Sequence, residues 1–475
     1  MDTFPSLLLR GGAITAQGPF AEAQAAFFDP DPAIVSRLRS LLAAHEVGVV
    51  AHFYMDPELQ GALYALDWPY MHISDSLVMA DRAVQMVEAG AKVITVLGVD
   101  FMSENVRAML DAAGHASVPV YRVSERAIGC SLAASAESLA YAAYLEEAAR
   151  TPRSLHVVYI NTSLRTKAHA QRRVPTITCT SSNVIRTVLQ AFAQEPEAHV
   201  WFGPDTYMGQ NLEAMLKGLA ELGDAAIARV HPAHTQATIR AALERFHYFK
   251  SGNCVVHHLF GAAVTEAIER DYPDAHITAH LEVPGEMFAA ALRARDRGRG
   301  VVGSTSDILG YIRERVIEAG ARGGAQLERF VLGTEAGMVT AIVHQLRPIL
   351  REHPQVTAEI IFPVASEAIA TTGDASLPIV PGVAGGEGCS TAGGCATCPY
   401  MKMNSIDALC DLLEGLGRGD DLSTYAPRTY DERLDGRTVA EVGVLPILHM
   451  RGFQRSGALP PELIDDVRGR TAALA

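Results

Sequence analysis

A threefold repetition of short motifs is the feature of this 475-residue chain that most restricts its fold. Each round begins with an apolar run that ends in polar residues: VGVVAHFY (47–54), LHVVYIN (155–161) and AHITAHLE (275–282). A hydroxyl-rich turn comes next: ISDSLVMA (73–80), CTSSNVIR (179–186) and GSTSDILG (303–310). A second apolar run then ends in glycine and an acid: VITVLGVDFM (93–102), AHVWFGPDTYM (198–208) and RFVLGTEAGM (329–338). One cysteine closes each round: Cys130, Cys254 and Cys398.

The repetition predicts three units of one topology. Short continuous apolar runs are typical of buried parallel strands, and amphipathic stretches such as residues 77–91 predict helices between them. We therefore expect an α/β protein of three similar small domains, each with a parallel sheet, in pseudo-threefold arrangement around a central cavity. The expected bounds are 40–130, 131–254 and 255–398, with an N-terminal extension at 1–39 and residues 400–475 as a candidate to pack on the first domain. The competing interpretation is that any α/β protein alternates in this way.

The three repeat-related cysteines suit a shared metal centre. Thiolates favour iron–sulfur clusters or zinc, and three ligands on a [4Fe-4S] cluster leave one iron open to act as a Lewis acid. An alternative is a local zinc site made of four cysteines: Cys389, Cys395, Cys398 and Cys410. Only the C-x-x-C interval from 395 to 398 matches a zinc pattern.

Polar residues follow the strand ends, where ligands bind in parallel sheets. Ser76, Ser181 and Thr305 stand in the hydroxyl-rich turns, which cap helices and also offer free N–H groups to carboxylate or phosphate. Candidate acid–base groups stand at the ends of the first strands or beside a cysteine: His52, Tyr54, Tyr159, His257, His280 and Glu282. These residue types predict a cavity that binds small anions and moves protons.

Composition limits the partners and the location. The formal net charge is −14, so we expect no nucleic-acid partner, which would require a basic face. No apolar run is long enough to predict a membrane span. Seven cysteines at low density and an acidic N-terminus predict a reducing, cytoplasmic location.

Taken together, HFYMDPELQ, SDSL, GVDFMSE, GCSLAAS, YINTS, CTSSN, FGPD, CVVHH, GSTS, GTEAGM and CPYMKMN resemble the quinolinate synthase family. The resemblance covers about residues 45–415. It implies a cytoplasmic enzyme of NAD biosynthesis that condenses iminoaspartate with dihydroxyacetone phosphate to give quinolinate. It also implies three α/β domains and one [4Fe-4S] cluster per chain, held by Cys130, Cys254 and Cys398.

The resemblance further implies a role for each candidate side chain. Tyr54, His280 and Glu282 would take part in proton transfer. The substrate-binding residues would be His52, Ser76, Tyr159, Asn161, Ser181, His257, Ser304 and Thr305. Functional coupling to an oxidase that produces iminoaspartate is a further expectation. The alternative function is a non-catalytic iron–sulfur sensor, which would need a partner-binding module that the sequence does not show.

Overall fold

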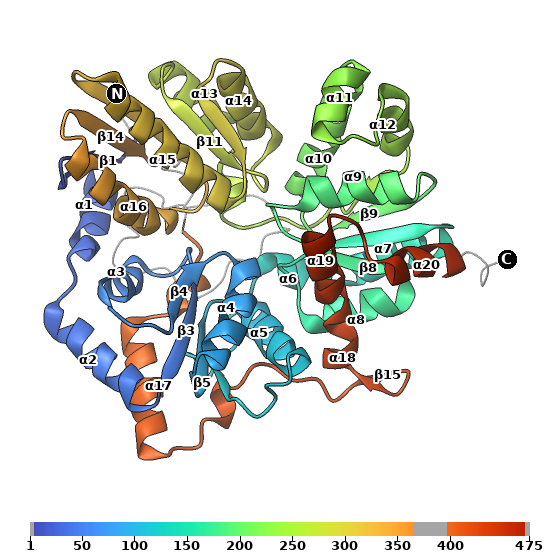
Figure 1. The fold of residues 1–475 in the computed structure, drawn as a ribbon, viewed down its shortest axis with the longest axis horizontal. Helices are drawn as coiled ribbons and strands as arrows, with labels where there is room; N and C mark the ends of the chain where they lie inside the picture. Colours follow the sequence, from blue (N-terminus) through green and yellow to red (C-terminus); the bar gives the residue numbers. More distant parts are fainter. Residues whose placement is uncertain (1–3, 364–396, 471–475) are drawn as a thin grey trace. The chain divides into compact units, whose positions relative to one another are not determined.

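The computed structural model describes residues 4–363 and 397–470. The chain divides into two compact units, one made of Met1–Gly129 with Val255–Pro427 and the other of Cys130–Cys254 with Arg428–Ala475. Figure 1 shows helices and strands alternating along most of the chain, which confirms the predicted mixed α/β class.

Three sheets share one strand order. The first unit contains one sheet in the order β4-β3-β5-β6: β3 (Val47–His52), β4 (Met71–Ser74), β5 (Val93–Leu97) and β6 (Val120–Arg122). The second unit contains the order β10-β9-β7-β8: β7 (Ser154–Tyr159), β8 (Thr176–Cys179), β9 (His199–Gly203) and β10 (Phe246–Tyr248). The first unit also contains β12-β11-β13-β14: β11 (His276–His280), β12 (Gly300–Gly303), β13 (Gln326–Gly333) and β14 (Val356–Ile361). All pairings within these sets are parallel.

In every sheet the first strand of the round lies between the second and the third, and the fourth lies beyond the third. The predicted repetition and the parallel sheets are therefore confirmed at the level of strand order. The pseudo-threefold arrangement around a cavity and the three-domain boundaries stay predictions.

The N-terminal residues extend the third sheet. β1 (Ser6–Arg10) pairs antiparallel with β14, and β2 (Ala13–Gln17) pairs antiparallel with β1. The buried Ser6 hydroxyl donates to the carboxylate of Glu359 on β14 at 2.9 Å, which ties this hairpin to the parallel set. Part of the predicted N-terminal extension, residues 1–39, therefore belongs to the third sheet.

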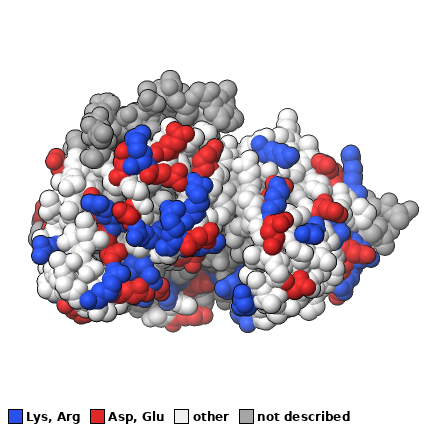
Figure 2. Space-filling model, turned by 90° about the horizontal axis from the view of Figure 1, so that it is seen from above, with Lys and Arg blue, Asp and Glu red and all other residues white. Residues whose placement is uncertain are grey.

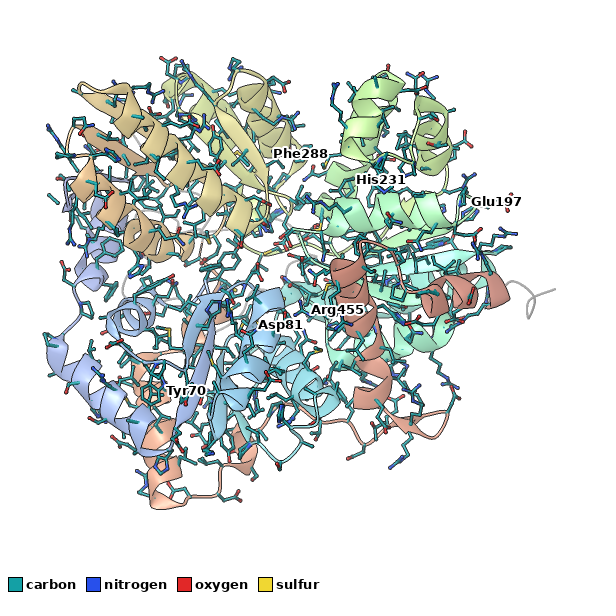
Figure 3. The ribbon with its side chains drawn as sticks, in the orientation of Figure 1. Tyr70, Asp81, Glu197, His231, Phe288 and Arg455 are labelled. Carbon is teal, nitrogen blue, oxygen red and sulfur yellow. The ribbon has the colours of Figure 1, made fainter. Side chains whose placement is uncertain are left out.

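Helices cover the sheets of the first unit (Figure 1). Their bounds are α1 (Pro19–Ala25), α2 (Pro32–Ala44), α3 (Pro57–Ala65), α4 (Ser76–Glu88), α5 (Asp100–Ala112), α13 (Ala262–Asp271), α14 (Gly285–Asp296), α15 (Thr305–Arg322), α16 (Met338–Glu352) and α17 (Ile406–Arg418). Ile312 of α15 and Ile342 of α16 are fully buried in one core with β13, and Leu38 of α2 and Leu409 of α17 in another with β3. Phe288 of α14, labelled in Figure 3, is 2% exposed.

The second unit has its own helices and core. They are α6 (Ser131–Ala136), α7 (Leu139–Arg150), α8 (Leu164–Arg173), α9 (Val184–Gln194), α10 (Thr206–Ala220), α11 (Asp224–Val230), α12 (Gln236–Leu243), α18 (Val439–Gly443), α19 (Leu445–Ser456) and α20 (Pro461–Gly469). Figure 1 shows α18 and α19 beside α8 and β8, and His449 of α19 lies 2.8 Å from the carbonyl oxygen of Thr176. Residues 428–475 are therefore part of the second unit, whereas α17 packs in the first.

The surface carries both charge signs. Figure 2 shows Lys and Arg side chains interspersed with Asp and Glu on the face in view. Exposed ion pairs such as Arg293–Glu269 at 2.6 Å contribute little to stability, which therefore depends mainly on the apolar cores. Within the described ranges, every helix is too short or too polar to cross a lipid bilayer.

Candidate active site

Two repeat-related strand ends in the first unit carry buried acid–base groups. His52 ends β3 and His280 ends β11, and the exposed fractions of these residues are 6% and 3%. In each case the backbone N–H two residues later donates to the histidine Nδ1, from Tyr54 at 3.2 Å and from Glu282 at 3.4 Å. A ring nitrogen that accepts this bond carries no proton, so Nε2 is the protonated nitrogen in the neutral ring.

Glu282 joins two imidazoles. Its Oε2 lies 2.7 Å from Nδ1 of His257 and 3.7 Å from Nδ1 of His280. The two rings are stacked, with centroids 4.8 Å apart. Glu282 is 3% exposed and His257 is 1% exposed, so the contact between the carboxylate and the imidazole lies in a region of low polarity.

Thr334 extends this cluster to Tyr54. Its Oγ1 lies 3.1 Å from the hydroxyl of Tyr54 and 3.2 Å from Nε2 of His257. The side chains thus form a continuous series of contacts: Tyr54, Thr334, His257, Glu282 and His280. We refer to these five residues and His52 as the acid–base cluster. A proton can move along the contacts of 2.7–3.2 Å from Tyr54 to Glu282, whereas His280, at 3.7 Å from the carboxylate, lies beyond hydrogen-bond distance.

Burial determines the protonation of the strand-end histidines. Loss of hydration lowers the pKa of His52 to about 3 and that of His280 to about 4. The Glu282 carboxylate opposes both shifts but does not cancel them. Both imidazoles are therefore neutral at pH 7, and each can donate a hydrogen bond from Nε2.

Glu335 holds the backbone of a predicted cluster ligand. Its Oε1 accepts from the N–H of Cys398 at 3.0 Å, and its Oε2 accepts from the N–H of Gly337 at 2.7 Å. Glu335 is 1% exposed, and Cys398 is half-buried. A Cβ at Gly337 would lie 2.9 Å from the carbonyl oxygen of Phe53, so glycine is needed for this close approach. Cys398 is thereby linked to the loop that carries Tyr54.

The hydroxyl-rich turns of the first unit begin helices at the same strand ends. Ser76 begins α4, and Ser304 caps α15 through a capping box with Asp307. The Ser304 hydroxyl donates to the Asp307 carboxylate at 2.7 Å, so part of its bonding capacity is used locally. The hydroxyl of Ser306 lies 3.5 Å from the carboxylate of Asp75, which brings the first and third turns together.

Thr305 begins α15 in the first unit, and the remaining predicted residues belong to the second unit. Tyr159 ends β7, Asn161 lies two residues later, and Ser181 precedes α9. Cys130 precedes α6, and Cys254 is the last residue of the first of the unit's two segments. The buried Lys167 of α8 donates to the carbonyl oxygens of Ile160 and Thr162 and so holds the loop that carries Asn161.

Burial separates the cysteines into two groups. Cys130, Cys254 and Cys398 are half-buried. Cys179 and Cys410 are buried, and burial raises the pKa of both thiols. The sequence analysis predicted a role for none of Thr334, Glu335 and Lys167. The signal for the first two was the motif GTEAGM, which places polar residues at the end of the third strand.

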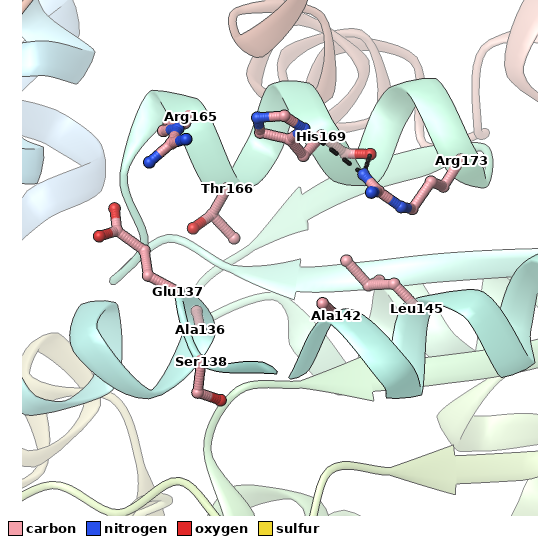
Figure 4. Close-up of a pocket in the computed structure, with 9 residues that line it drawn as sticks. All are labelled: Ala136, Glu137, Ser138, Ala142, Leu145, Arg165, Thr166, His169 and Arg173. Atoms are coloured by element: carbon pink, nitrogen blue, oxygen red, sulfur yellow. Dashed lines mark hydrogen bonds between the residues drawn. The ribbon is translucent and has the colours of Figure 1, made fainter. Parts of the chain in front are cut away.

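A cavity of about 190 Å³ between α7 and α8 lies outside this set of residues (Figure 4). Arg165, His169 and Arg173 line it from one side of α8. The Glu432 carboxylate lies 3.2 Å from Arg165 Nε and 3.1 Å from His169 Nε2, and Arg173 Nε donates to Glu146 at 2.7 Å. Its basic groups already have acidic partners, and no predicted site residue lines it.

Parallel sheets with buried acid–base groups at the carboxyl ends of their strands define an α/β enzyme. Residues 36–423 match the sequence model of a family described as "Quinolinate synthetase A protein". The chain belongs to the quinolinate synthase family, as the resemblance implied.

Individual relatives support this membership. The chain is 52% identical to a chloroplastic quinolinate synthase of Nicotiana tabacum, over 99% of this chain and 68% of the relative. It is 51% identical to a chloroplastic quinolinate synthase of Oryza sativa subsp. japonica, over 98% of this chain and 69% of the relative. Identity to the quinolinate synthase of Thermosynechococcus vestitus is 25%, over 79% of this chain and 85% of the relative. The chain thus spans about two thirds of the length of the plant relatives.

The predicted cytoplasmic location is wrong by this comparison. The relatives at 51–52% identity are named chloroplastic, which points to a plastid. The prediction relied on cysteine density and on the N-terminal residues, and a low cysteine density indicates a reducing environment without distinguishing one compartment from another.

Proposed function

We propose that this chain forms quinolinate by condensing iminoaspartate with dihydroxyacetone phosphate, as a step of NAD biosynthesis. The observation that carries the proposal is the acid–base cluster. It combines two neutral histidines, a buried carboxylate–histidine pair and a tyrosine hydroxyl at neighbouring strand ends. A condensation followed by loss of water needs groups that remove and return protons in a protected site.

The donor set fits a [4Fe-4S] cluster. Cys130, Cys254 and Cys398 carry half-buried thiols, whereas the raised pKa of the buried Cys179 and Cys410 disfavours their thiolate forms. When bound by these three thiolates, a cluster supplies an open iron that acts as a Lewis acid. Cys389 and Cys395 of the alternative zinc site lie outside the described residues.

The proton-transfer roles follow the geometry. The Glu282 carboxylate lies 2.7 Å from Nδ1 of His257, and Thr334 lies between this pair and the Tyr54 hydroxyl. We assign proton transfer to Tyr54, His280 and Glu282, with His257 in contact with the substrate. His52 donates from Nε2 to a substrate carboxylate, because its Nδ1 already accepts the N–H of Tyr54.

Anion binding is assigned to the turns and the second unit. Ser76 and Thr305 stand at the N-termini of α4 and α15, where free N–H groups favour carboxylate or phosphate without a lysine. Ser304 stands in the same turn as Thr305 and is assigned to substrate binding with it. Tyr159, Asn161 and Ser181 supply the remaining substrate contacts from the second unit. An oxidase that produces iminoaspartate is the proposed functional partner, because iminoaspartate hydrolyses in water. No finding supports the alternative of a non-catalytic sensor.

The test is turnover of the anaerobically purified protein with both substrates, with quinolinate measured by chromatography. We expect product from the wild type and a loss of roughly 10²-fold or more in kcat for Glu282→Gln, the scale of general acid–base catalysis. Glu328 offers a matched control. It contacts His276 at 2.9 Å across β11 and β13, at the opposite end of these strands. Glu328→Gln should retain turnover. Absence of quinolinate from iron-loaded wild-type protein would overturn the proposed function.

A further inference from the structure

A second cavity, of about 190 Å³, lies in the first unit between α3 and α16. Both helices begin just beyond the acid–base cluster, since α3 starts at Pro57 and α16 at Met338. Gln60 of α3 joins them, because its Nε2 donates to the carbonyl oxygens of Phe53 at 2.7 Å and Gly337 at 3.0 Å. The cavity therefore lies behind the proposed active site, one to two helical turns along each helix.

The walls of the cavity are aromatic and apolar. Tyr64 stacks on His344 with ring centroids 4.2 Å apart and planes inclined by 22°. Phe28 and Val343 are buried and complete the apolar lining. This wall suits the face of a planar ring, because aromatic side chains stack on such a face.

Polar groups with unused bonding capacity also line the cavity. Thr340 is 3% exposed, and its hydroxyl has no hydrogen-bond partner within residues 4–363 and 397–470. The buried Nε of Arg347 likewise finds no acceptor in that part of the chain. The terminal nitrogens of Arg347 donate to the carbonyl oxygen of Phe28 at 3.2 Å and to the carboxylate of Asp29 at 3.2 and 3.4 Å. Buried polar groups rarely stay unsatisfied, so these two donors indicate a missing acceptor.

We propose that this cavity binds a small, single-ring aromatic carboxylate. The ring would pack against Tyr64, His344 and Phe28, and the carboxylate would accept from the Thr340 hydroxyl and Arg347 Nε. A cavity of about 150 Å³ holds benzene, so a site of 190 Å³ holds one ring but no nucleotide. Asp29 already pairs with the terminal nitrogens of Arg347, and a carboxylate offers one oxygen to each of the two remaining donors, which a neutral ring does not. The bound molecule contacts both helices that lead into the acid–base cluster.

The test is thermal unfolding of the full chain with benzoate, compared with inorganic phosphate and with benzyl alcohol. A ligand that binds only the folded state raises Tm, and the apparent Kd follows from the dose dependence. We expect benzoate to raise Tm and the other two probes to have a much smaller effect. Thr340→Val should weaken benzoate binding about fivefold or more through loss of one hydrogen bond.

A matched control separates loss of binding from loss of folding. Thr340→Val removes an unpaired hydroxyl and keeps the side-chain shape, so the variant should fold. Thr95 on β5 is 1% exposed and its hydroxyl also has no described partner, so Thr95→Val makes the same chemical change away from the cavity. It should bind benzoate as the wild type does.

Three outcomes would overturn the proposal. The first is no Tm shift with benzoate, and the second is an equal shift with phosphate or benzyl alcohol. The third is undiminished benzoate binding in Thr340→Val, which would place benzoate elsewhere, for example at the strand ends. Should Thr340→Val unfold, Tyr64→Ala, which removes the stacking ring, provides the same comparison.

Discussion

At the scale of single residues, the acid–base cluster depends on a few short contacts between buried groups. The Glu282 carboxylate contacts the His257 ring, and the Thr334 hydroxyl lies between His257 and Tyr54. A hydroxyl can donate to one neighbour while it accepts from the other. Thr334 is therefore positioned to align the side chains of Tyr54 and His257.

Thr334→Val removes this hydroxyl and keeps the β-branched shape. We expect kcat for quinolinate formation to fall roughly tenfold or more, because two hydrogen bonds of about 1 kcal/mol each are lost. Steady-state kinetics would measure the effect. Thr95→Val, a similar change on β5, should leave kcat within about twofold. Equal kcat in wild type and Thr334→Val would remove the threonine from the proton-transfer arrangement.

The proposed cluster is also tested by single residues. Replacing Cys130, Cys254 or Cys398 by serine should abolish most of the iron and sulfide bound after anaerobic purification, since serine is a poor ligand for a soft centre. Cys410→Ser should keep both, because Cys410 is 1% exposed in the core around α17. Elemental analysis and the visible absorption of the cluster give the comparison. Loss of iron in Cys410→Ser alone would contradict the assignment of ligands.

At the scale of elements, helices hold the loops that follow the strands. In the first unit, Gln60 fixes α3 and the start of α16 against the loop after β3. In the second unit, the fully buried Lys167 of α8 donates to the carbonyl oxygens of Ile160 and Thr162 after β7. A buried ammonium is stable only with such partners, so the loop and the helix depend on one another.

Lys167→Met should therefore destabilise the second unit by roughly 2–4 kcal/mol, because two buried carbonyl groups lose a charged donor. Urea denaturation followed by circular dichroism would measure the change in the free energy of unfolding. Lys217→Met is the control, since Lys217 is exposed and pairs with Glu213 on the surface of α10 at 2.8 Å. Its effect should stay below about 0.5 kcal/mol. Equal effects of the two variants would show that Lys167 does not hold the loop.

At the scale of the whole molecule, three parallel sheets repeat one strand order and bury ionisable groups in both units. His52 and His280 are buried at strand ends of the first unit. His156 lies on β7 of the second, 2.8 Å from the hydroxyl of Tyr141. Burial lowers the pKa of His156 to about 3. Neutral buried histidines make the stability of the whole chain depend on pH.

The free energy of unfolding should fall as pH decreases from 6.5 towards 4. Below pH 6.5 these histidines bind protons in the unfolded chain, while the folded forms stay neutral down to about pH 3 or 4. The unfolded state then binds more protons, so each histidine contributes a slope of about 1.4 kcal/mol per pH unit, and its stabilisation is complete above pH 6.5. Urea denaturation between pH 5 and 6.5 would measure it.

His156→Gln tests the origin of this slope. The free energy of unfolding of this variant should depend less steeply on pH, by the equivalent of about one bound proton. This change in slope is separate from any loss of stability that is the same at every pH. Thr95→Val, which removes a buried hydroxyl and no titratable group, should keep the wild-type slope. An unchanged slope in His156→Gln would mean that this histidine is protonated in the folded protein over the same pH range.

Much of the local structure could be predicted because its causes lie close together in the sequence. The runs 47–54, 155–161 and 275–282 became β3, β7 and β11, since continuous apolar stretches form buried strands. The turn at Ser304 began a helix because a capping box needs only a residue and its third neighbour. The order of these signals was enough to predict the repeated sheets.

The tertiary structure alone decided which of these residues meet. No local pattern reveals that Thr334 contacts Tyr54, that Glu335 accepts the N–H of Cys398, or that β1 joins β14. These contacts join residues tens to hundreds of positions apart, and their formation depends on strand pairing and core packing across the whole unit. The sequence by itself thus determined the elements, the chemical groups at their ends and the family. Their arrangement into an acid–base cluster, and the cavity between α3 and α16, came from long-range packing.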